Sequence, residues 1–360
     1  MSANQILLWI MGISALIGGI DRITGNHLKL GSAFDEGFQA LGELALGMTG
    51  MLCLAPVLAG FLAPALRPVF HLFGLDPSLV GILIANDMGG YALAMELCES
   101  EAAGLYAGLF VASMLGCTLV FTIPVAFHIL REEDKEVFSF GLLIGFITIP
   151  FGSLVGGLLA GFPMGMLLRN SVPVLLLSLL LVICLKFFYH QTIRCCLFVG
   201  KLITALTYIG LIAAAFEYLT GVTLIPGMSP IMDAMATVSA CGITLLGTFP
   251  FLHLLIALLK RPLGQLARLL SIDEESVSGL VFSLANSVPV YKNMKNMSKK
   301  GIVLNTAWLV CATAALGDHL AFTASVQPDY LLAVSVGKIA GGLLGVVLAC
   351  RFYREDTTNI

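Results

Sequence analysis

Long apolar stretches separated by short polar ones occupy most of the 360-residue chain. Each stretch is too long and too rich in glycine for the strands of a soluble protein. Such stretches are typical of helices in lipid, where every backbone amide must be paired within its own segment. The pattern therefore predicts an all-α polytopic membrane protein. Eleven apolar segments lie near residues 5–22, 38–64, 78–97, 102–130, 138–167, 171–190, 198–220, 234–259, 276–294, 301–325 and 330–350.

The composition agrees with this pattern and excludes several classes of protein. Hydrophobic residues make up 58% of the chain and charged residues 11%, with a mean hydropathy of +0.96, whereas soluble domains carry about 25% charged residues. A net charge of −3 without a basic tract gives no indication of a nucleic-acid partner. The nine cysteines have no metal-ligand spacing with histidine, so neither a metal nor another cofactor is expected.

Two of the eleven segments are interrupted in the middle. Ser78–Leu97 is broken at residues 86–90, where Gly89 and Gly90 suit a sharp turn with positive φ. Ser276–Met294 is broken around Asn286 and Ser287, and Pro289 marks the equivalent break. Each half has only about 8–10 residues, too few to cross a bilayer at 1.5 Å per residue. These segments either cross with a break or enter and return as helical hairpins.

The distribution of Lys and Arg favours the hairpins. If all eleven segments cross, the 18 Lys and Arg other than Lys338 divide nine to nine between the two sides. If the two broken segments re-enter, sixteen lie on one side and only Arg67 and Arg169 on the other. Cytoplasmic loops carry the excess of positive charge. The sequence therefore predicts about nine crossings plus two re-entrant hairpins, with the N-terminus outside and the C-terminus in the cytoplasm.

Short blocks of sequence recur in the same order in the two halves. Inverted repeats with broken helices at corresponding positions are typical of secondary transporters. An odd number of crossings separates the copies, so two inverted repeats are predicted: 1–165 and 197–360, joined by a linking span and loop at 166–196. The recurrences pair Asp21, Thr24, Gly25, Leu28 and Gly31 with Glu217, Thr220, Gly221, Leu224 and Gly227; Ala85, Asn86 and Tyr91 with Ala285, Asn286 and Tyr291; and Gly116, Phe121 and Thr122 with Gly317, Phe322 and Thr323.

Three carboxylates fall within or at the edge of apolar segments, namely Glu43, Asp87 and Asp318. A charge in the membrane costs at least about 2.5–3.5 kcal/mol, so such residues are candidates for function. Asp87 stands at the first break, where the carbonyl end of a half-helix adds to its attraction for a cation. The amides of Asn86 and Asn286 can donate to and accept from a hydroxyl.

The other polar residues of these segments have both functional and structural interpretations. Asp318 and His319 can bind a cation, relay protons or form a structural polar pair. Lys338 in the last segment can neutralise one of the acids. Aromatic rings can receive an ammonium group or simply pack, and three stand near the polar positions: Tyr91, Tyr291 and Trp308.

Catalysis has little support in the sequence. The chain contains no HExxH, GxSxG or P-loop motif, so an enzyme is not expected. A conduction pathway accounts for more of the polar residues than catalysis does. Their chemistry fits a small organic cation or a proton-coupled polar solute.

Several motifs together resemble the ethanolamine utilization permease family, the EutH proteins. The resemblance extends over essentially the whole chain. It rests on FDEGF at 34–38, LAPVLAG at 54–60, ANDMGGYALAMEL at 85–97, TIPFG at 148–152, LIPG at 224–227, LANSVP at 284–289 and GDHLAF at 317–322.

This resemblance implies a permease of the bacterial cytoplasmic membrane that takes up ethanolamine for catabolism. Ethanolamine is largely protonated at neutral pH, as a lysine side chain is. By this interpretation Asp87 or Asp318 binds its ammonium group, and Asn86, Asn286 or Ser287 binds its hydroxyl. The alternatives are a proton-coupled carrier of a nucleoside-like or amino-alcohol compound and, as a minor one, a membrane sensor or scaffold. A homo-oligomer is compatible with every interpretation.

Overall fold

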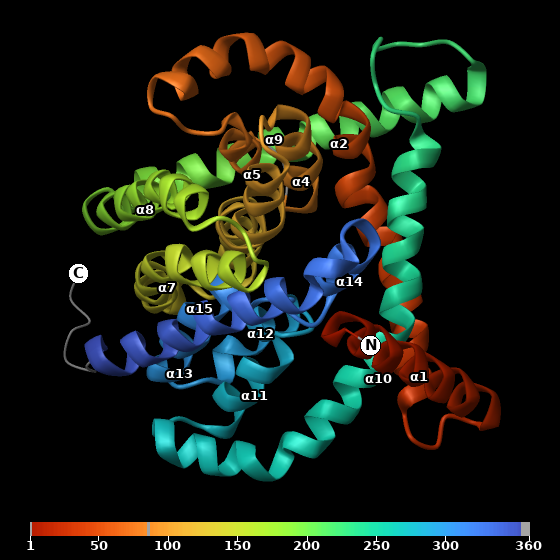
Figure 1. Cartoon of the computed structure of the whole chain (residues 1–360). Helices are drawn as coiled ribbons and strands as arrows, with labels where there is room; N and C mark the ends of the chain where they lie inside the picture. Colours follow the sequence, from red (N-terminus) through yellow and green to blue (C-terminus); the bar gives the residue numbers. More distant parts are fainter. Residues whose placement is uncertain (1, 85–86, 354–360) are drawn as a thin grey trace.

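A computed structural model describes residues 2–84 and 87–353, except for the side chains of residues 84, 87, 259–264 and 266. All regular secondary structure of the described chain is helical, with 3-10 and π segments among the α-helices (Figure 1). The elements up to the middle are α1 (Ala3–Thr24), α2 (Leu30–Leu72), η1 (Pro77–Val80), α3 (Gly81–Ile84), α4 (Asp87–Leu97), α5 (Glu101–Leu105), the π-helices η2 (Tyr106–Gly116) and η3 (Thr118–Thr122), α6 (Ile123–Ile129), α7 (Glu132–Leu159) and α8 (Met164–Phe187). They are followed by α9 (Tyr189–Thr220), α10 (Ile231–Leu270), α11 (Glu274–Phe282), α12 (Val288–Asn293), η4 (Met294–Asn296), α13 (Lys299–Ala312), α14 (Asp318–Val326), η5 (Pro328–Tyr330) and α15 (Leu331–Phe352).

Eight continuous helical runs of the described chain are long and apolar enough to span a membrane. They correspond to eight of the nine predicted crossings, which confirms a multi-pass membrane protein. The remaining predicted segment, 301–325, is not one continuous helix, because residues 313–317 separate α13 from α14. Ala314 has a positive φ of 53° at this interruption. A helix cannot continue through that conformation.

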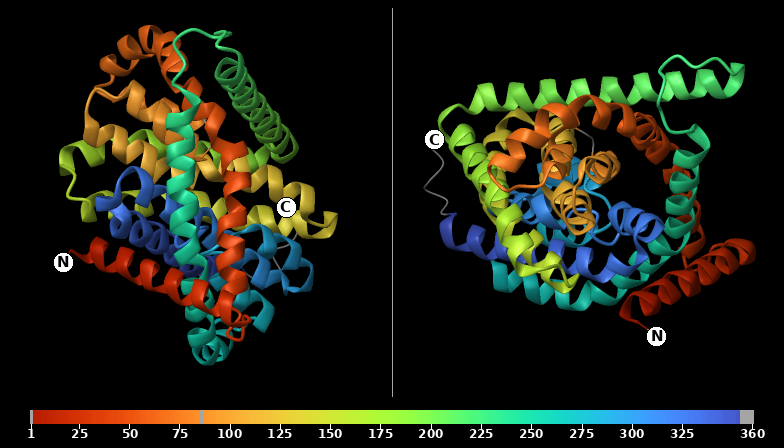
Figure 2. Two further views of the ribbon diagram at one scale, coloured as in Figure 1. Left: turned by 90° about the vertical axis from the view of Figure 1, so that its right-hand side faces the viewer. Right: turned by 45° about the horizontal axis from the view of Figure 1, so that its top comes forward.

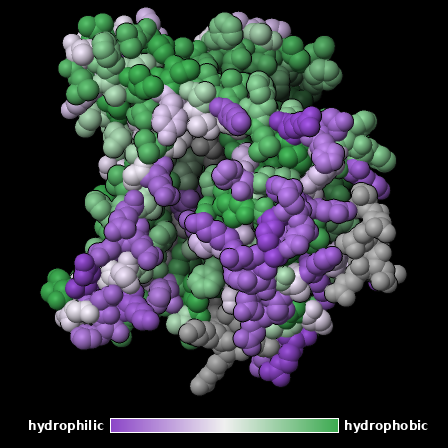
Figure 3. All heavy atoms as spheres, turned by 180° about the vertical axis from the view of Figure 1, so that it is seen from behind, coloured by the Kyte–Doolittle hydropathy of each residue, from purple (hydrophilic) through white to green (hydrophobic). Residues whose placement is uncertain are grey.

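Large apolar side chains lie exposed along α8 and α9, as expected for a surface that faces lipid. Leu176 on α8 is 61% exposed and Ile212 on α9 is 63% exposed. In the space-filling view of Figure 3, apolar side chains cover the upper part of one face, and polar ones gather across its middle and lower part. Water does not tolerate apolar patches of this extent, whereas a bilayer does.

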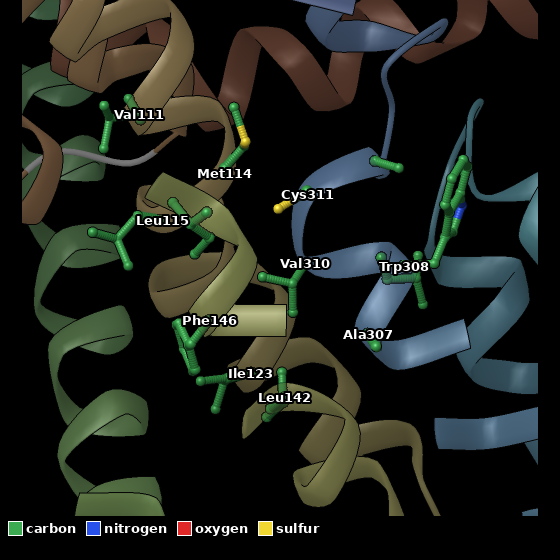
Figure 4. Packing of buried hydrophobic residues seen from close by; sticks show 14 of the residues in the cluster. Val111, Met114, Leu115, Ile123, Leu142, Phe146, Ala307, Trp308, Val310 and Cys311 are labelled. Carbon is green, nitrogen blue, oxygen red and sulfur yellow. The ribbon is translucent and has the colours of Figure 1, made fainter. Parts of the chain in front are cut away.

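The interior is packed where α7 lies between the π-helical segment and α13 (Figure 4). Phe146 of α7, Leu115 of η2 and Val310 of α13 are fully buried there. The Thr118 hydroxyl at the start of η3 donates hydrogen bonds to two main-chain carbonyls, that of Met114 (2.7 Å) and that of Val310 on α13 (3.3 Å). A hydroxyl paired in this way avoids the cost of burying an unsatisfied polar group.

An aspartate joins the two ends of the first broken segment, which contains η1, α3 and α4. One carboxylate oxygen of Asp76 accepts a hydrogen bond from the amide of Ser78 at 2.9 Å, at the start of the segment. The other oxygen accepts from the amides of Glu99 and Ser100, each at 3.2 Å, just past its end. The chain therefore leaves and returns to the same place between residues 76 and 100.

The second broken segment, formed by α11 and α12, has the same arrangement. Asp273 Oδ1 accepts from the amide of Ser276 at 2.8 Å, and Oδ2 accepts from the amide and hydroxyl of Ser298 at 2.8 and 2.6 Å. Partial burial tends to raise the pKa of Asp273, but the hydrogen bonds from Ser298 and Ser276 outweigh it and lower the pKa to about 2. We call Asp76 and Asp273, with the amides that they bind, the aspartate clasps.

The long helices α2 and α10 lie side by side at the edge of the bundle, and α1 extends outside them (Figure 2). Glycines bring their backbones together. A Cβ atom on Gly37 would lie 2.4 Å from the carbonyl oxygen of Leu245 on α10. On another side of α2, a Cβ on Gly50 would lie only 1.7 Å from the carbonyl oxygen of Thr207 on α9. Neither position can accept a side chain without a shift of the helices.

We expect Gly50→Ala to separate α2 from α9 and destabilise the fold by about 1–3 kcal/mol, the usual cost of overpacking. Gly42→Ala is the matched control on the same helix, because nothing lies within 4 Å of a Cβ built there. The thermal unfolding midpoint of each purified variant in detergent measures the difference. Equal midpoints for the two variants would contradict the tight crossing of α2 and α9.

The second clasp predicts an acid-sensitive contribution to stability. The folded pKa of Asp273, about 2, lies below the ordinary value of 3.8. The stabilisation is therefore complete above about pH 5 and is lost as the pH falls toward 2. We expect Asp273→Asn to lower the unfolding midpoint at neutral pH and to flatten its dependence on pH over this acidic range.

Asp329→Asn serves as the control for this measurement, because Asp329 is an exposed carboxylate in the short η5 helix. If Asp273 causes the loss of stability in acid, the unfolding midpoint of the control variant depends on pH as that of the native protein does. An unchanged acid dependence in Asp273→Asn would refute the assignment.

Candidate functional site

A cavity of about 220 Å³ lies between the α2–α10 pair and the broken segments. One wall comes from the two long helices and the other from the chain interruptions, so residues far apart in sequence meet there. The α2–α10 wall contributes Ala40, Glu43, Leu44, Gly47, Met48, Leu245 and Phe249. The opposite wall contributes Met88, Cys117, Phe121, Asn286, Ser287, Val288, Thr313, Ala314, Asp318 and His319.

The opposite wall is built where two helix breaks run past each other. The amide of Ala314 donates to the carbonyl of Ser283 at 2.8 Å, and the amide of Leu316 donates to that of Leu284 at 2.9 Å. Main-chain groups freed by the breaks are thus paired with one another, as burial requires. A Cβ on Gly317 would lie 2.0 Å from the carbonyl oxygen of Ala285. Glycine is therefore required where the two breaks cross.

Two carboxylates enter the cavity from its two walls. Asp318 is the first residue of α14, and Glu43 comes from α2. The N-terminal end of a helix favours a negative charge, so the position of Asp318 supports its ionised form. The remaining lining is largely apolar, including Met48, Met88 and Leu245. The partly buried carboxylate of Asp318 in such surroundings attracts a cation more strongly than a carboxylate in water does, whereas Glu43 is exposed.

Five of the candidate residues named from the sequence line this cavity together: Glu43, Asn286, Ser287, Asp318 and His319. Asn286 lies in the break before α12, where its side-chain oxygen accepts a hydrogen bond from the amide of Val288 at 2.9 Å. Its amide nitrogen is then the group that can donate to a ligand. Ser287 follows, with only 3% of its surface exposed.

Other predicted residues lie away from the cavity lining. Tyr91 is half-buried, and its hydroxyl accepts a hydrogen bond from Gln327 at 3.3 Å. Tyr291 is buried, with its ring edge-to-face against Phe138 at 6.1 Å. Trp308 donates its indole N–H to the Ser283 hydroxyl at 2.9 Å. These aromatic residues pack and position the helices around the breaks.

The prediction that Gly89 and Gly90 form the first break is wrong. The described helix α4 begins at Asp87, so both glycines are helical and have no positive φ. A Cβ on Gly90 would lie 3.3 Å from that of Ala112, so Gly90 allows close packing against η2 instead. Pro289 lies in the first turn of α12, as expected for a helix that starts after a break. Asn86 and the side chain of Asp87 lie outside the described residues.

Two aromatic rings that line the cavity were missed in the sequence analysis, Phe121 of η3 and Phe249 of α10. Thr313, at the break between α13 and α14, was missed as well. Phe121 and Thr313 occur in segments without a polar interruption like those at 86–90 and 286–289. The only sequence feature that singled out Phe121 was its match to Phe322 in the recurring blocks of the two halves. That match does not show which face of the helix points into the cavity.

Lys338 lies behind the site and is fully buried in α15. Its ammonium group donates to the carbonyl of Ser113 in the π-helix η2 at 2.6 Å. Ser113, Met88 and His319 border a second, smaller hollow next to the cavity. Lys338 thus brings a positive charge to the segment that supports the candidate site.

The fold and the cavity together define the class of this protein: an all-helical, multi-pass membrane protein with a small, acidic cavity between two groups of helices. The family of ethanolamine utilisation proteins, EutH, matches residues 3–352, and the chain belongs to this family.

Curated relatives align with nearly the whole chain, and some of them carry a name that refers to transport. The chain is 41% identical to the "Probable ethanolamine permease EutH" of Listeria monocytogenes, over 99% of this chain and 97% of the relative. It is 37% identical to the protein of the same name from Salmonella typhimurium, over 99% and 97%. It is also 39% identical to the "Uncharacterized protein YxeR" of Bacillus subtilis, over 97% and 95%. No solved structure matches the chain.

Proposed function

We propose that this protein is a permease that takes up ethanolamine into the bacterial cytoplasm for catabolism. The observation that carries the proposal is the cavity that Glu43 and Asp318 enter from opposite walls. Relatives that align with the whole chain are named probable ethanolamine permeases, which supports the same substrate.

The ammonium group of ethanolamine is the part that two carboxylates recognise. At neutral pH the amine is mostly protonated, so it enters as a cation and offsets the cost of holding the partly buried Asp318 away from water. The faces of Phe121 and Phe249 provide further attraction for a cation. In this proposal Asp318 is the principal ligand, because it lies on the wall that also carries polar groups for the hydroxyl.

The hydroxyl of the substrate is assigned to Asn286, Ser287 and Thr313. These residues border the same cavity and can both donate and accept hydrogen bonds. Ethanolamine has four non-hydrogen atoms, and very small ligands gain at most about 1.5 kcal/mol per atom. The dissociation constant is therefore expected to be no tighter than tens of micromolar, which suits a carrier that must release its cargo.

For the topology we propose nine crossings and two re-entrant hairpins in inverted repeats 1–165 and 197–360, with the linker at 166–196. The aspartate clasps support it, because a segment that crossed the bilayer would have its ends about 30 Å apart. The order of elements supports the repeats as well. A long helix, α2 or α10, precedes each broken segment, and a long helix, α7 or α15, closes each half. The N-terminus is proposed to lie outside and the C-terminus in the cytoplasm.

Access to the cavity from each side is proposed to alternate through motion of the broken segments past the α2–α10 pair. The cavity lies at the boundary between these two groups of helices. Motion at that boundary can expose the cavity to one side and then the other without unfolding either wall.

A second candidate is proton-coupled transport of another small polar solute, such as an amino-alcohol or nucleoside-like compound. Asp318 and the adjacent His319 both border the cavity, and a carboxylate beside an imidazole is the pair of groups that a proton relay uses. Asp87, the acid that the sequence places at the first break, is tested with the same assay.

We expect Asp318→Asn to reduce uptake of labelled ethanolamine by at least tenfold, because the neutral amide no longer attracts the ammonium group. Uptake is measured in sealed proteoliposomes containing equal amounts of folded protein. Asp329→Asn is the matched control, since it removes an equal charge at an exposed position outside the cavity, and it should transport at the native rate.

Other results of this assay would redirect the assignment. Equal uptake by Asp318→Asn and the native protein would exclude Asp318 and make Asp87→Asn the decisive variant. Strong competition by nucleosides, with no uptake of ethanolamine, would favour the second candidate. Uptake of ethanolamine that follows an imposed proton gradient would establish proton coupling with the proposed substrate.

The proposed topology predicts that residues 99 and 296 lie on opposite sides of the membrane. One cysteine at a time is introduced, by Glu99→Cys or Asn296→Cys, in a background where the exposed Cys195 and Cys350 and the partly exposed Cys98 and Cys184 are replaced by serine. An impermeant thiol reagent added to intact cells should label position 99 only. Labelling of both positions from outside would rule out the proposed hairpins.

A further inference from the structure

A second large cavity, of about 680 Å³, lies far from the candidate site, where α7 begins, α8 ends and α9 begins. The rings of Phe140 on α7 and Tyr353 after α15 lie 5.7 Å apart, so this end of the bundle also carries the end of α15. Residues of four elements line the cavity, and they fall into a charged group, an aromatic group and an apolar group. We call it the α7–α9 pocket.

The charged lining has an excess of positive charge. Three cations, Lys135, Lys186 and Arg194, face two carboxylates, Glu132 and Glu136. The ammonium of Lys135 is paired with Glu132 at 2.5 Å. Lys186 lies over the ring of Phe187 at 5.7 Å from its centroid. A ring contact leaves the N–H groups of Lys186 able to donate to an oxygen ligand.

The inner part of the pocket is aromatic with polar tips. The rings of Phe127 and Tyr189 lie 6.4 Å apart, and the hydroxyl of Ser139 donates to that of Tyr189 at 3.4 Å. Tyrosine rings with a polar tip are typical of the boundary between lipid and water. The pocket thus has the mixed chemistry of the headgroup region.

The walls continue into the surface that faces lipid. Leu185, Ile193 and Leu197 line the pocket. Beside them on the same helices, Ile183 is 52% exposed and Phe198 is 67% exposed. A ligand bound to the cations can therefore extend apolar chains along α8 and α9 without entering water.

We propose that the α7–α9 pocket binds a phospholipid with a net negative headgroup. The phosphate lies between Lys186 and Arg194, and the acyl chains follow the exposed surfaces of α8 and α9. The excess of cations over carboxylates selects an anionic headgroup over a zwitterionic one. Basic pockets between membrane helices on the cytoplasmic side are suited to such headgroups, and this side carries most of the Lys and Arg in the proposed topology.

The test measures lipid binding by the purified full-length protein in detergent, with native mass spectrometry to count bound lipids and thermal unfolding to follow stabilisation. Dioleoyl phosphatidylglycerol should bind and raise the midpoint more than phosphatidylethanolamine or phosphatidylcholine does. Lys186→Gln with Arg194→Gln should weaken its apparent affinity about 30-fold, because each cation near an anionic headgroup contributes roughly fivefold. Glycerol 3-phosphate, which lacks the acyl chains, should have no effect.

The matched control is Lys292→Gln with Lys299→Gln, which removes the same charge from exposed positions outside the pocket. Equal losses in the two double variants would overturn the proposal, and so would equal binding of the anionic and zwitterionic lipids. The exchanged variant Lys186→Arg with Arg194→Lys keeps both charges and should retain binding even if the glutamine variant folds poorly. This test measures no transport, so its outcome is independent of the proposed substrate.

Discussion

The aspartate clasps are the constraint on which the site depends. Each uses one carboxylate to bind amides at the start of a broken segment and past its end, so the segment leaves and returns to one place. The middle of such a segment then lies inside the bundle. Backbone N–H and C=O groups at the break need hydrogen-bond partners. Lipid and apolar side chains offer none, so other main-chain groups must provide them. In the second half of the chain those partners are on the neighbouring break, between α13 and α14.

The cavity follows from this arrangement together with the close approach of α2 and α10. Glycine lets the two long helices form one continuous wall, and the crossing breaks form the other. Asp318 is tolerated in an apolar segment because its partly buried side chain borders this cavity. Lys338 is another polar group buried beside the cavity. Its side-chain nitrogen donates a hydrogen bond to the carbonyl of Ser113 in the π-helix η2. The polar groups of the membrane interior thus concentrate around one small volume.

Much of this arrangement could be predicted from the sequence, because hydropathy and interruptions are properties of the chain itself. The segments and the break at 286–289 were accessible in this way, whereas the grouping of Asp318 with Asn286 and Ser287 came from the resemblance to a family. The break at 313–317 was not, since an alanine takes the left-handed conformation in an apolar run that carries no proline. Gly89 and Gly90 misled because a glycine pair suits a turn and a tight helix contact equally well. The inward positions of Phe121 and Phe249 depend on helix rotation, which a nearly uniform apolar segment does not encode.

The hydrogen bonds between the two crossing breaks also have a mechanical meaning. Ser287 follows one break and Asp318 follows the other, and the backbone bridges at Ala314 and Leu316 hold the breaks in a fixed register. In the proposed alternation of access, a displacement of one break would therefore move the other with it. The groups proposed for the hydroxyl and for the amine would keep their separation throughout that movement. Selection by the length of the substrate would then belong to this one wall, and the wall of α2 and α10 would add attraction for the cation through Glu43 and Phe249.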